Sequence, residues 1–324
     1  MKPTLSILMP VYNIKQEWVK EAIDTVYEVI ERTTGDVELL IIEDHSPDNI
    51  YEWIKPYVAD KKHVDVIRNP ENWGKTKSTL YYLDKLKGKY LLYLDGDDYI
   101  DPENMIKFLR KLNNIPQQEV ILTDWIYQDR VKIASHKGED IETKKLDAKI
   151  KHFNANTYYG LKFYRKMKIN YGADRRHILA DKYSTMIALR NATKISYIRM
   201  APYVYRLYGT SKPCDIFKTQ DEYNSMLKWI LTIPLDNPIV QESQKYQMWR
   251  QMTAYVVINW ANPKQYRSMR DFVKDIKEYV KEANEEVSKV YKKSSWFNNM
   301  FKYSFWEGYN YIMWIPMMIV RHKK

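Results

Sequence analysis

The apolar residues of the first part of the chain fall into short continuous runs separated by stretches of helical spacing. Strands are predicted at residues 5–9, 37–42, 64–67, 90–94 and 120–127; the runs at 37–42 and 90–94 are continuous, and 90–94 has the pattern of a strand buried on both faces of a sheet. Helices are predicted for residues 17–32, from the turn at 45–48 to residue 58, for 75–86 and from 102 to about 112. This alternation predicts an α/β fold in which right-handed strand–helix–strand units build a mostly parallel sheet.

The pattern changes in the second half of the chain. Residues 129–151 are polar and rich in lysine, which predicts a surface loop, and an ordered aromatic segment follows at 158–165. A helix is predicted for 181–190, and two strands for 194–200 and 203–208 on either side of Pro202. Beyond Lys212-Pro213 the spacing is helical almost to the end. We therefore expect two domains, residues 1–212 and a smaller helical one at 213–324.

Composition narrows the class of partner. The 324 residues are 45% apolar and 29% charged, as in globular proteins, and the single Cys214 excludes an internal disulfide framework. A formal net charge of +11 favours anionic partners, which include nucleic acid, an anionic membrane and phosphorylated substrates. Because no helix-turn-helix, zinc or ribonucleoprotein motif accompanies the charge, nucleic acid is not the expected partner.

The fourth predicted strand ends directly on three carboxylates, those of Asp95, Asp97 and Asp98. A strand of a parallel sheet delivers such residues to the carboxyl edge, where open α/β sheets bind ligands. Crowded carboxylates repel one another unless a cation neutralises them, and their oxygens suit Mg2+ or Mn2+. The alternative is a solvated acidic turn, in which Asp101 caps the helix that begins at Pro102.

Two neighbouring strands also lead into polar residues, Asn13 and Asp44, and in a parallel sheet these ends form one crevice. A carboxylate there can accept hydrogen bonds from a uracil imide or a ribose diol, and Tyr12 can stack on a base. A metal ion at Asp95 and Asp97 would bind a diphosphate and stabilise it as a leaving group. Base, ribose and diphosphate therefore all have candidate partners.

Four motifs follow one another along the chain: Pro10-Val11-Tyr12-Asn13, Glu43-Asp44-His45-Ser46-Pro47-Asp48, Asn72-Trp73-Gly74 and Leu94-Asp95-Gly96-Asp97-Asp98. In this order they resemble glycosyltransferase family 2, across most of residues 1–212. The resemblance implies the GT-A fold, a Rossmann-like and mostly parallel sheet flanked by helices. It also implies an inverting, metal-dependent transfer of a hexosyl or N-acetylhexosaminyl group. The donor would be a UDP-sugar, the acceptor a hydroxyl of a glycan, and the cofactor Mn2+ or Mg2+.

The resemblance also implies roles for individual residues. Asp97 would be the main metal ligand, with Asp95 beside it. Asp181, which follows an alanine where the family often has glutamate, would be the catalytic base, and a helix N-cap is the alternative for this position. The nucleotide-sugar contacts would come from Pro10, Tyr12, Asn13, Asp44, Asn72, Lys75, Asp95, Gly96 and Arg206.

The chain departs from the family pattern after the Asn72-Trp73-Gly74 loop. There the family commonly carries Ala-Arg-Asn, whereas this chain has Ser78-Thr79-Leu80. The missing arginine leaves its diphosphate or sugar contact to Lys75 or Lys77. Arg206 would bind the diphosphate through bidentate hydrogen bonds from its guanidinium, and a surface arginine at a strand end is the alternative.

The last stretch, residues 295–324, is dense in aromatic residues and ends on Arg321-His322-Lys323-Lys324. This composition predicts a membrane-interface segment, with a core or dimer helix as the alternative. No run reaches the roughly 20 apolar residues of a membrane span, and residues 5–9 are too short for a signal peptide. We therefore expect a cytoplasmic protein, peripheral at the inner face of the cell membrane, that acts on a lipid-linked glycan in cell-surface polysaccharide synthesis. The sequence leaves open whether the chain forms a homo-oligomer.

Two other functions are compatible with parts of the sequence. A binding protein that kept this fold and lost turnover is supported by Ala180 and the missing arginine. The retained Asp181 argues against it, because binding alone needs no base. A P-loop nucleotide hydrolase is suggested by Gly74-Lys75-Thr76 after a strand, but that motif requires glycine where this chain has Asn69.

Overall fold

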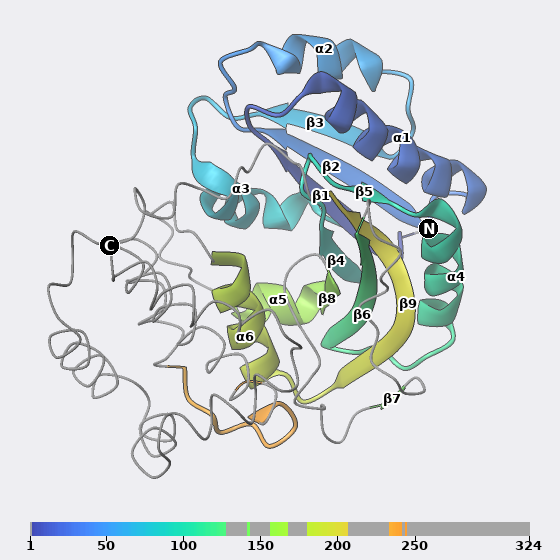
Figure 1. Ribbon diagram of the computed structural model, residues 1–324, viewed down its shortest axis with the longest axis vertical. Coiled ribbons are helices and arrows are strands. Elements are labelled where there is room, and N and C mark those ends of the chain that lie inside the picture. The colour runs from blue at the N-terminus through green and yellow to red at the C-terminus, as the bar shows by residue number, and fades with distance from the viewer. Residues whose placement is uncertain are drawn as a thin grey trace, which may run out of the picture. The chain divides into compact units, whose positions relative to one another are not determined.

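The computed structural model describes residues 2–127, 141–142, 156–167, 180–206, 233–241 and 244 (Figure 1). The chain divides into two compact units, of which the first comprises Met1–Lys144, His152–Arg176 and Ala180–Lys212. The fold below is that of this first unit. Nearly all of the loop expected at 129–151, most of the domain expected at 213–324 and all of the segment at 295–324 lie outside the described residues. The domain boundary and the membrane-interface segment therefore stay predictions.

Strands and helices alternate along the unit. The strands are β1 (Leu5–Val11), β2 (Val37–Glu43), β3 (Val64–Arg68), β4 (Tyr90–Tyr93), β5 (Tyr99–Ile100), β6 (Val120–Tyr127), β7 (Ile141–Glu142), β8 (Thr157–Gly160) and β9 (Ile195–Tyr205). The helices are α1 (Gln16–Arg32), α2 (Ile50–Tyr57), α3 (Gly74–Tyr82), the 3₁₀ helix η1 (Leu83–Lys85), α4 (Pro102–Asn113), α5 (Leu161–Met167) and α6 (Ala180–Asn191). None of the helices in the described residues is long and apolar enough to span a membrane.

The strands form one mixed sheet in the order β3-β2-β1-β4-β8-β6-β9-β5, with β7 paired to β9. Strands β3, β2, β1 and β4 are parallel neighbours, β8 runs antiparallel between β4 and β6, and β9 is parallel to β6. Since β4 and β6 both oppose β8, the carboxyl ends of β1, β2, β4, β6 and β9 point to the same edge. The α/β fold with a mostly parallel sheet is confirmed.

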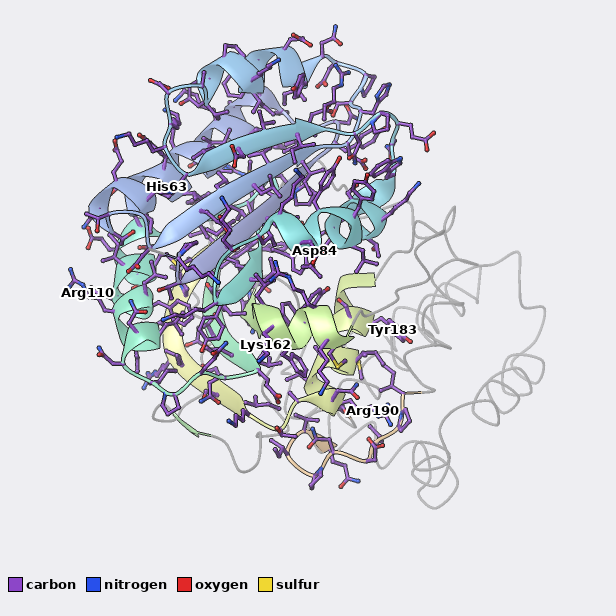
Figure 2. All side chains as sticks on the ribbon, turned by 180° about the vertical axis from the view of Figure 1, so that it is seen from behind. His63, Asp84, Arg110, Lys162, Tyr183 and Arg190 are labelled. Carbon is purple, nitrogen blue, oxygen red and sulfur yellow. The ribbon has the colours of Figure 1, made fainter. Side chains whose placement is uncertain are left out.

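Alternate side chains of the central strands face opposite sides of the sheet and are buried on both; Figure 2 shows the sheet and its helices from behind. Ile7 and Leu92 are fully buried in the layer that α1 and α4 cover. On the other face, the ring of Tyr93 packs against those of Tyr159 and Tyr164, and the hydroxyls of Tyr93 and Tyr164 are hydrogen bonded at 3.0 Å. Each fully buried aliphatic side chain contributes about 1.5–3 kcal/mol to the stability of the fold. The strand ends are therefore held by a sheet that is packed on both sides.

The second half of the sheet differs from the prediction in several places. Strand β7, inside the stretch that was expected to be a surface loop, pairs with β9. The two strands predicted around Pro202 are one strand, β9. Its register with β6 shifts between Thr123 and Trp125, and this irregularity accommodates a residue that has no N–H to donate. Strand β5 was not predicted, because its two residues carry no periodic pattern. Asp101 caps α4 as expected, its side chain accepting a hydrogen bond from the amide of Asn104 at 2.9 Å.

Candidate active site

The carboxyl ends of β1, β2 and β4 lie side by side and form one polar edge. The amide of Asp44 donates to the carbonyl of Val11 at 2.9 Å, and the amide of Leu94 donates to the carbonyl of Leu8 at 3.0 Å. These bonds continue the strand pairing just past the strands. The structure thus brings the predicted residues that follow the three strands to the same edge of the sheet.

Asp44 holds the start of α3. Its carboxylate accepts hydrogen bonds from the amide of Trp73 at 2.8 Å, the amide of Gly74 at 2.7 Å and the side chain of Asn69 at 2.7 Å. The amides at a helix start have no partner within the helix, so a buried carboxylate there satisfies them. Asp44 therefore anchors the loop that carries Asn72. Contact of Asp44 with a nucleoside stays a prediction.

Glu43, the residue before Asp44, stabilises the same edge through buried contacts. Glu43 is fully buried; its Oε1 accepts the amide of Ser46 at 2.5 Å, and its Oε2 lies 3.1 Å from Nε of Arg68. The hydroxyl oxygen of Ser46 in turn accepts the amide of Asn13 at 3.1 Å. Asn13 has a φ of 52°, in the left-handed region that asparagine tolerates better than most residues. This chain of contacts ties the end of β2 to the end of β1.

Tyr12 and Gly96 shape the surface beside the acids. Tyr12 is 45% exposed, so its ring is open to a planar ligand. Gly96 is needed for close packing: a Cβ there would lie 3.2 Å from the carbonyl oxygen of Pro10 and 2.9 Å from Cδ1 of Ile14. The end of β1 therefore leaves no room for a side chain at position 96.

Lys75 is the cation that α3 brings to the acidic loop, the segment after β4 that carries Asp95, Asp97 and Asp98. Its ammonium forms an ion pair with Asp95, and the two side chains are 35% and 40% exposed. Lys77 points elsewhere, because its Nζ lies 4.0 Å from a carboxylate oxygen of Glu71 and 4.7 Å from the centre of the Trp73 ring. Of the two lysines that could replace the missing arginine, Lys75 is thus the one beside the acids.

Asp98 is turned inward and tied to β9. Its Oδ2 accepts the hydroxyl of Tyr203 at 2.5 Å, and its Oδ1 accepts the amide of Arg206 at 2.8 Å. Burial raises the pKa of the Asp98 carboxyl well above its usual value, and the negative charges of Asp95 and Asp97 raise it further. Burial and the neighbouring Asp98 likewise raise the pKa of Tyr203 well above its usual value. The third carboxylate of the cluster therefore holds the acidic loop in place.

Arg206 is nearly buried and already has protein partners, so its contact with a diphosphate stays a prediction. Its side chain is 7% exposed; Nε donates to the carbonyl of Asp97 at 2.7 Å, and the guanidinium pairs with Glu21. The rings of Trp18 and Tyr99 each lie 5.3 Å from its central carbon. Arg206 fastens the end of β9 and the acidic loop to α1. To contact a diphosphate, the guanidinium would have to leave these partners.

Asp181 occupies the second position of α6 (Ala180–Asn191). The helix predicted at 181–190 forms, one residue longer at each end. The side chain of Asp181 lies outside the described residues, so its role as a base stays a prediction. The dipole of a helix stabilises an ionised carboxylate in the first turn, which suits a base that must be charged near neutral pH.

Within the described residues, no group of three or more His, Cys, Asp and Glu side chains forms a complete metal cage. Asp95 and Asp97 fit a hard divalent ion that is bound in another way. Mg2+ commonly keeps several waters and is held by one or two carboxylates together with substrate phosphates. The negative charge with which Asp95 and Asp97 raise the pKa of Asp98 is also the charge that such an ion would neutralise.

Two residues that build this edge, Tyr203 and Glu21, were not singled out from the sequence. Tyr203 bonds to Asp98 across 105 positions, and Arg206 pairs with Glu21 across 185. Pairs so far apart leave no local pattern, and Glu21 reads as one more charged residue on a helix surface. The available signal was the stretch Tyr203-Val204-Tyr205-Arg206, which contains two of these partners.

Sequence comparisons agree with these motifs. The family model described as Glycosyl transferase family 2 matches residues 6–172. An uncharacterized glycosyltransferase of Methanocaldococcus jannaschii is 29% identical over 128 residues, which cover 39% of this chain and 42% of that protein. The uncharacterized glycosyltransferase EpsJ of Bacillus subtilis is 20% identical over 300 residues, 86% of this chain and 85% of that protein. The minor teichoic acid biosynthesis protein GgaB of Bacillus subtilis is 29% identical over 114 residues, 34% of this chain and 12% of that protein.

A solved structure shares the fold. S. aureus TarS 1-349, in complex with UDP-GlcNAc, superimposes with a TM-score of 0.58 at 17% identity. The superposition covers 89% of this chain and 83% of that one. This likeness confirms the expected GT-A fold. The alignment with the M. jannaschii protein, by contrast, spans less than half of that protein's length.

Proposed function

Because the chain belongs to glycosyl transferase family 2, we propose that it moves a sugar from a UDP-sugar to a hydroxyl of a glycan acceptor, with inversion. The observation that carries this proposal is the single polar edge where the acidic loop after β4 meets the ends of β1 and β2. Parallel α/β sheets bind nucleotides at such an edge. The UDP-GlcNAc complex of the structural neighbour supports the choice of donor class.

Donor binding is assigned to the surface around β1. The 45% exposed ring of Tyr12 stacks on the uracil, with Pro10 and Asn13 beside it. Asn72, on the loop that Asp44 anchors, adds a polar contact. Asp44 therefore contributes mainly by fixing the loop, since its oxygens already accept several hydrogen bonds.

The diphosphate is assigned to the acidic loop and to Lys75. A divalent ion, Mn2+ or Mg2+, held by Asp97 and Asp95, would supply positive charge against the departing diphosphate. To serve as a metal ligand, Asp95 has to share or give up its ion pair with Lys75. The released ammonium then lies within reach of the phosphate oxygens and takes over the contact that the missing arginine would make.

Proton transfer is assigned to Asp181. The carboxylate accepts the proton of the acceptor hydroxyl as that oxygen attacks the anomeric carbon, and the bond from this carbon to UDP breaks on the opposite side. The position in the first turn of α6 keeps the carboxylate ionised between turnovers. Attack from the face opposite the leaving group inverts the configuration.

The acceptor is assigned to the class of cell-surface glycans. The similarity to the teichoic acid biosynthesis protein GgaB supports a polysaccharide acceptor. The aromatic and basic residues of 295–324 support attachment to the inner face of the cell membrane and hence a lipid-linked acceptor. Removing 295–324 should release the protein from anionic liposomes; unchanged sedimentation of the shortened chain would refute the attachment.

A screen of nucleotide sugars for Mn2+-dependent release of UDP tests the function, because slow hydrolysis of the correct donor needs no acceptor. We expect release from one or a few UDP-sugars and little from GDP- or dTDP-sugars. UDP binding without release from any donor, even with acceptor glycans added, would favour the non-catalytic binding protein. Release of phosphate from free ATP would favour the nucleotide hydrolase.

A further inference from the structure

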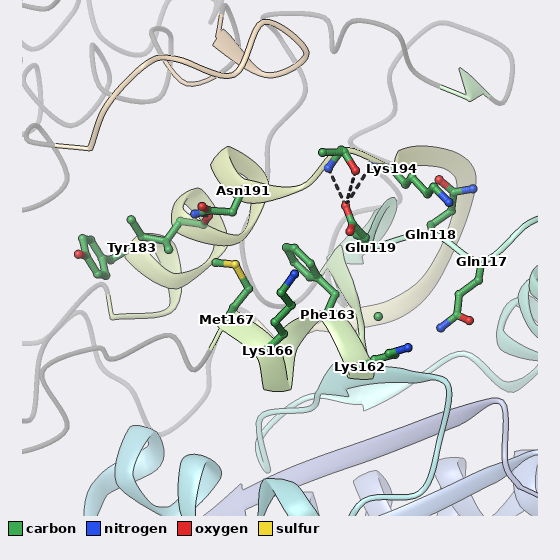
Figure 3. A pocket seen from close by; sticks show the side chains of 13 residues that line it. Gln117, Gln118, Glu119, Lys162, Phe163, Lys166, Met167, Tyr183, Asn191 and Lys194 are labelled. Carbon is green, nitrogen blue, oxygen red and sulfur yellow. Dashed lines mark hydrogen bonds between the residues drawn. The ribbon is translucent and has the colours of Figure 1, made fainter.

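A hollow lies at the opposite edge of the sheet, the amino edge (Figure 3). It has a volume of about 1000 Å³. Its lining includes the residues just before β6 and just before β9, and Gly160 at the end of the antiparallel strand β8. Gly160 pairs with Tyr90 at the start of β4, whereas Asp95 of the acidic loop follows the end of that strand. At the usual rise of a strand, Tyr90 and Asp95 are about 17 Å apart. The hollow is therefore separate from the candidate active site.

The hollow is positively charged. Lys162 and Lys166 from α5 and Lys194 before β9 contribute three cations to its lining, and no acidic residue in the described part of the chain pairs with them. The acid in the lining, Glu119, is already engaged: its Oε2 accepts the amide of Thr193 at 2.6 Å, the hydroxyl of Thr193 at 3.0 Å and the amide of Lys194 at 3.2 Å (Figure 3). The lining thus favours an anionic ligand.

The remaining lining suits a sugar chain. Phe163 and Tyr183 provide rings with apolar faces, and the side-chain amide of Gln117 can donate and accept hydrogen bonds. The amide nitrogen of Asn191 donates to the carbonyl of Ile187 at 2.9 Å, which leaves its oxygen as an acceptor. Sugars present the same combination of apolar ring faces and hydroxyls. A concave site fits such a chain better than it fits the flat surface of a bilayer. Together with the lysines, this lining indicates a glycan that carries negative charges.

Helix α6 connects the hollow with the proposed transfer site. Tyr183, Ile187 and Asn191 follow one another at intervals of four residues, so they share a face of the helix, and all three line the hollow. Asp181 stands at the start of the same helix. The lining face of α6 extends about 12 Å along the helix axis, from Asn191 to Tyr183, toward the end that carries Asp181.

We propose that the hollow is a distal subsite for an anionic acceptor glycan. Its lysines hold the negative groups of the part already built, and the free end of the glycan follows α6 to the start of that helix. This inference rests on the proposed function, in which the acceptor reaches Asp181. To that function it adds that the acceptor is negatively charged and that the protein binds it at a second site.

Direct binding tests the subsite without any turnover. The full chain, Lys162→Glu/Lys166→Glu and the control Lys107→Glu/Arg110→Glu are titrated with oligogalacturonate, with neutral malto-oligosaccharide of equal length and with UDP. Lys107 and Arg110 are exposed on α4, and Figure 2 shows Arg110 well apart from Lys162. The two variants change net charge equally, so their comparison separates the hollow from general charge. UDP affinity reports whether each variant is folded.

We expect the unaltered chain to bind oligogalacturonate at least about tenfold more tightly than the neutral chain, and only the hollow variant to lose about tenfold in affinity. Equal losses in both variants, or equal affinity for the two oligosaccharides, would overturn the subsite. Failure to release UDP from any donor would sink the proposed function while leaving this binding result unaffected.

Discussion

The carboxyl and amino edges of the sheet differ in whether their charged side chains have partners in the part of the protein that the structure describes. At the carboxyl edge the acids are held by partners from other elements, as Asp95 is by Lys75 and Asp98 by Tyr203. At the amino edge, Lys162 extends from α5 without an acidic partner among the described residues. The carboxyl edge is therefore organised before a ligand arrives, whereas the amino edge presents charge for a ligand to neutralise. Substitutions of the buried residues at the first edge should affect stability, whereas substitutions of the exposed lysines at the second should affect binding alone.

The largest effect on stability is expected at the buried acid. Asp98→Ala should lower the free energy of unfolding by about 3 kcal/mol, because it leaves the Tyr203 hydroxyl and the Arg206 amide without their buried acceptor. Asp98→Asn keeps an oxygen acceptor and removes the buried charge, so it should cost clearly less. Urea unfolding followed by tryptophan fluorescence measures both. Equal losses for the two variants would contradict the assigned role of these hydrogen bonds.

The second-largest effect on stability is expected at Arg206, whose guanidinium joins the end of β9 to the acidic loop and to α1. Arg206→Ala should lower the free energy of unfolding by about 2 kcal/mol, since it removes the bond to the Asp97 carbonyl and the ion pair with Glu21. Arg110→Ala, on an exposed face of α4, serves as the matched control and should change it by less than about 0.5 kcal/mol. A stable Arg206→Ala variant that had lost only UDP affinity would instead support the diphosphate clamp.

A smaller effect, confined to binding, is expected at Lys75. Lys75→Met should weaken UDP affinity in the presence of Mn2+ by about tenfold, because the ammonium no longer reaches the diphosphate. The free energy of unfolding should change by less than about 1 kcal/mol, since its ion pair with Asp95 is partly exposed. Lys77→Met is the neighbouring control and should leave UDP affinity unchanged. Calorimetric titration with UDP decides between them, and equal losses would remove the special role of Lys75.

The smallest effect on stability is expected at the amino edge. Lys162→Glu/Lys166→Glu should change the free energy of unfolding by no more than about 0.5 kcal/mol, because both side chains are exposed. The same urea unfolding measurement applies. A loss as large as that of Asp98→Ala would show that these lysines belong to the packed structure, and the contrast between the two edges would disappear.

Most of the parallel half of the sheet could be predicted from the sequence. Strands β1, β2 and β4 are buried along nearly their whole length, so each leaves an almost continuous apolar run, and the ends of all four strands β1 to β4 lie within two residues of the prediction. The strands of the other half, which includes β5, β6 and β9, were harder to predict. Strand β5 is too short to show a period, and Pro202 indicated a break where an irregularity in the pairing of β9 with β6 accommodates it.

The site was predictable to the extent that it follows from strand direction. Residues after parallel strands share an edge whatever their partners are, which is why Asn13, Asp44 and Asp95 could be grouped. What each side chain touches depends on contacts between distant parts of the chain. Neither the capping of α3 by Asp44 nor the engagement of Arg206 has a local pattern in the sequence.

Sugar transfer at the carboxyl edge with Asp181 as the base is tested most directly by Asp181→Asn, with transfer and UDP affinity measured on the same preparation. The amide keeps the shape of the side chain and cannot take up the acceptor proton. Transfer from the donor found in the nucleotide-sugar screen should fall by at least about a hundredfold, while UDP affinity with Mn2+ stays within about twofold. Normal transfer together with lost UDP affinity would contradict the assignment.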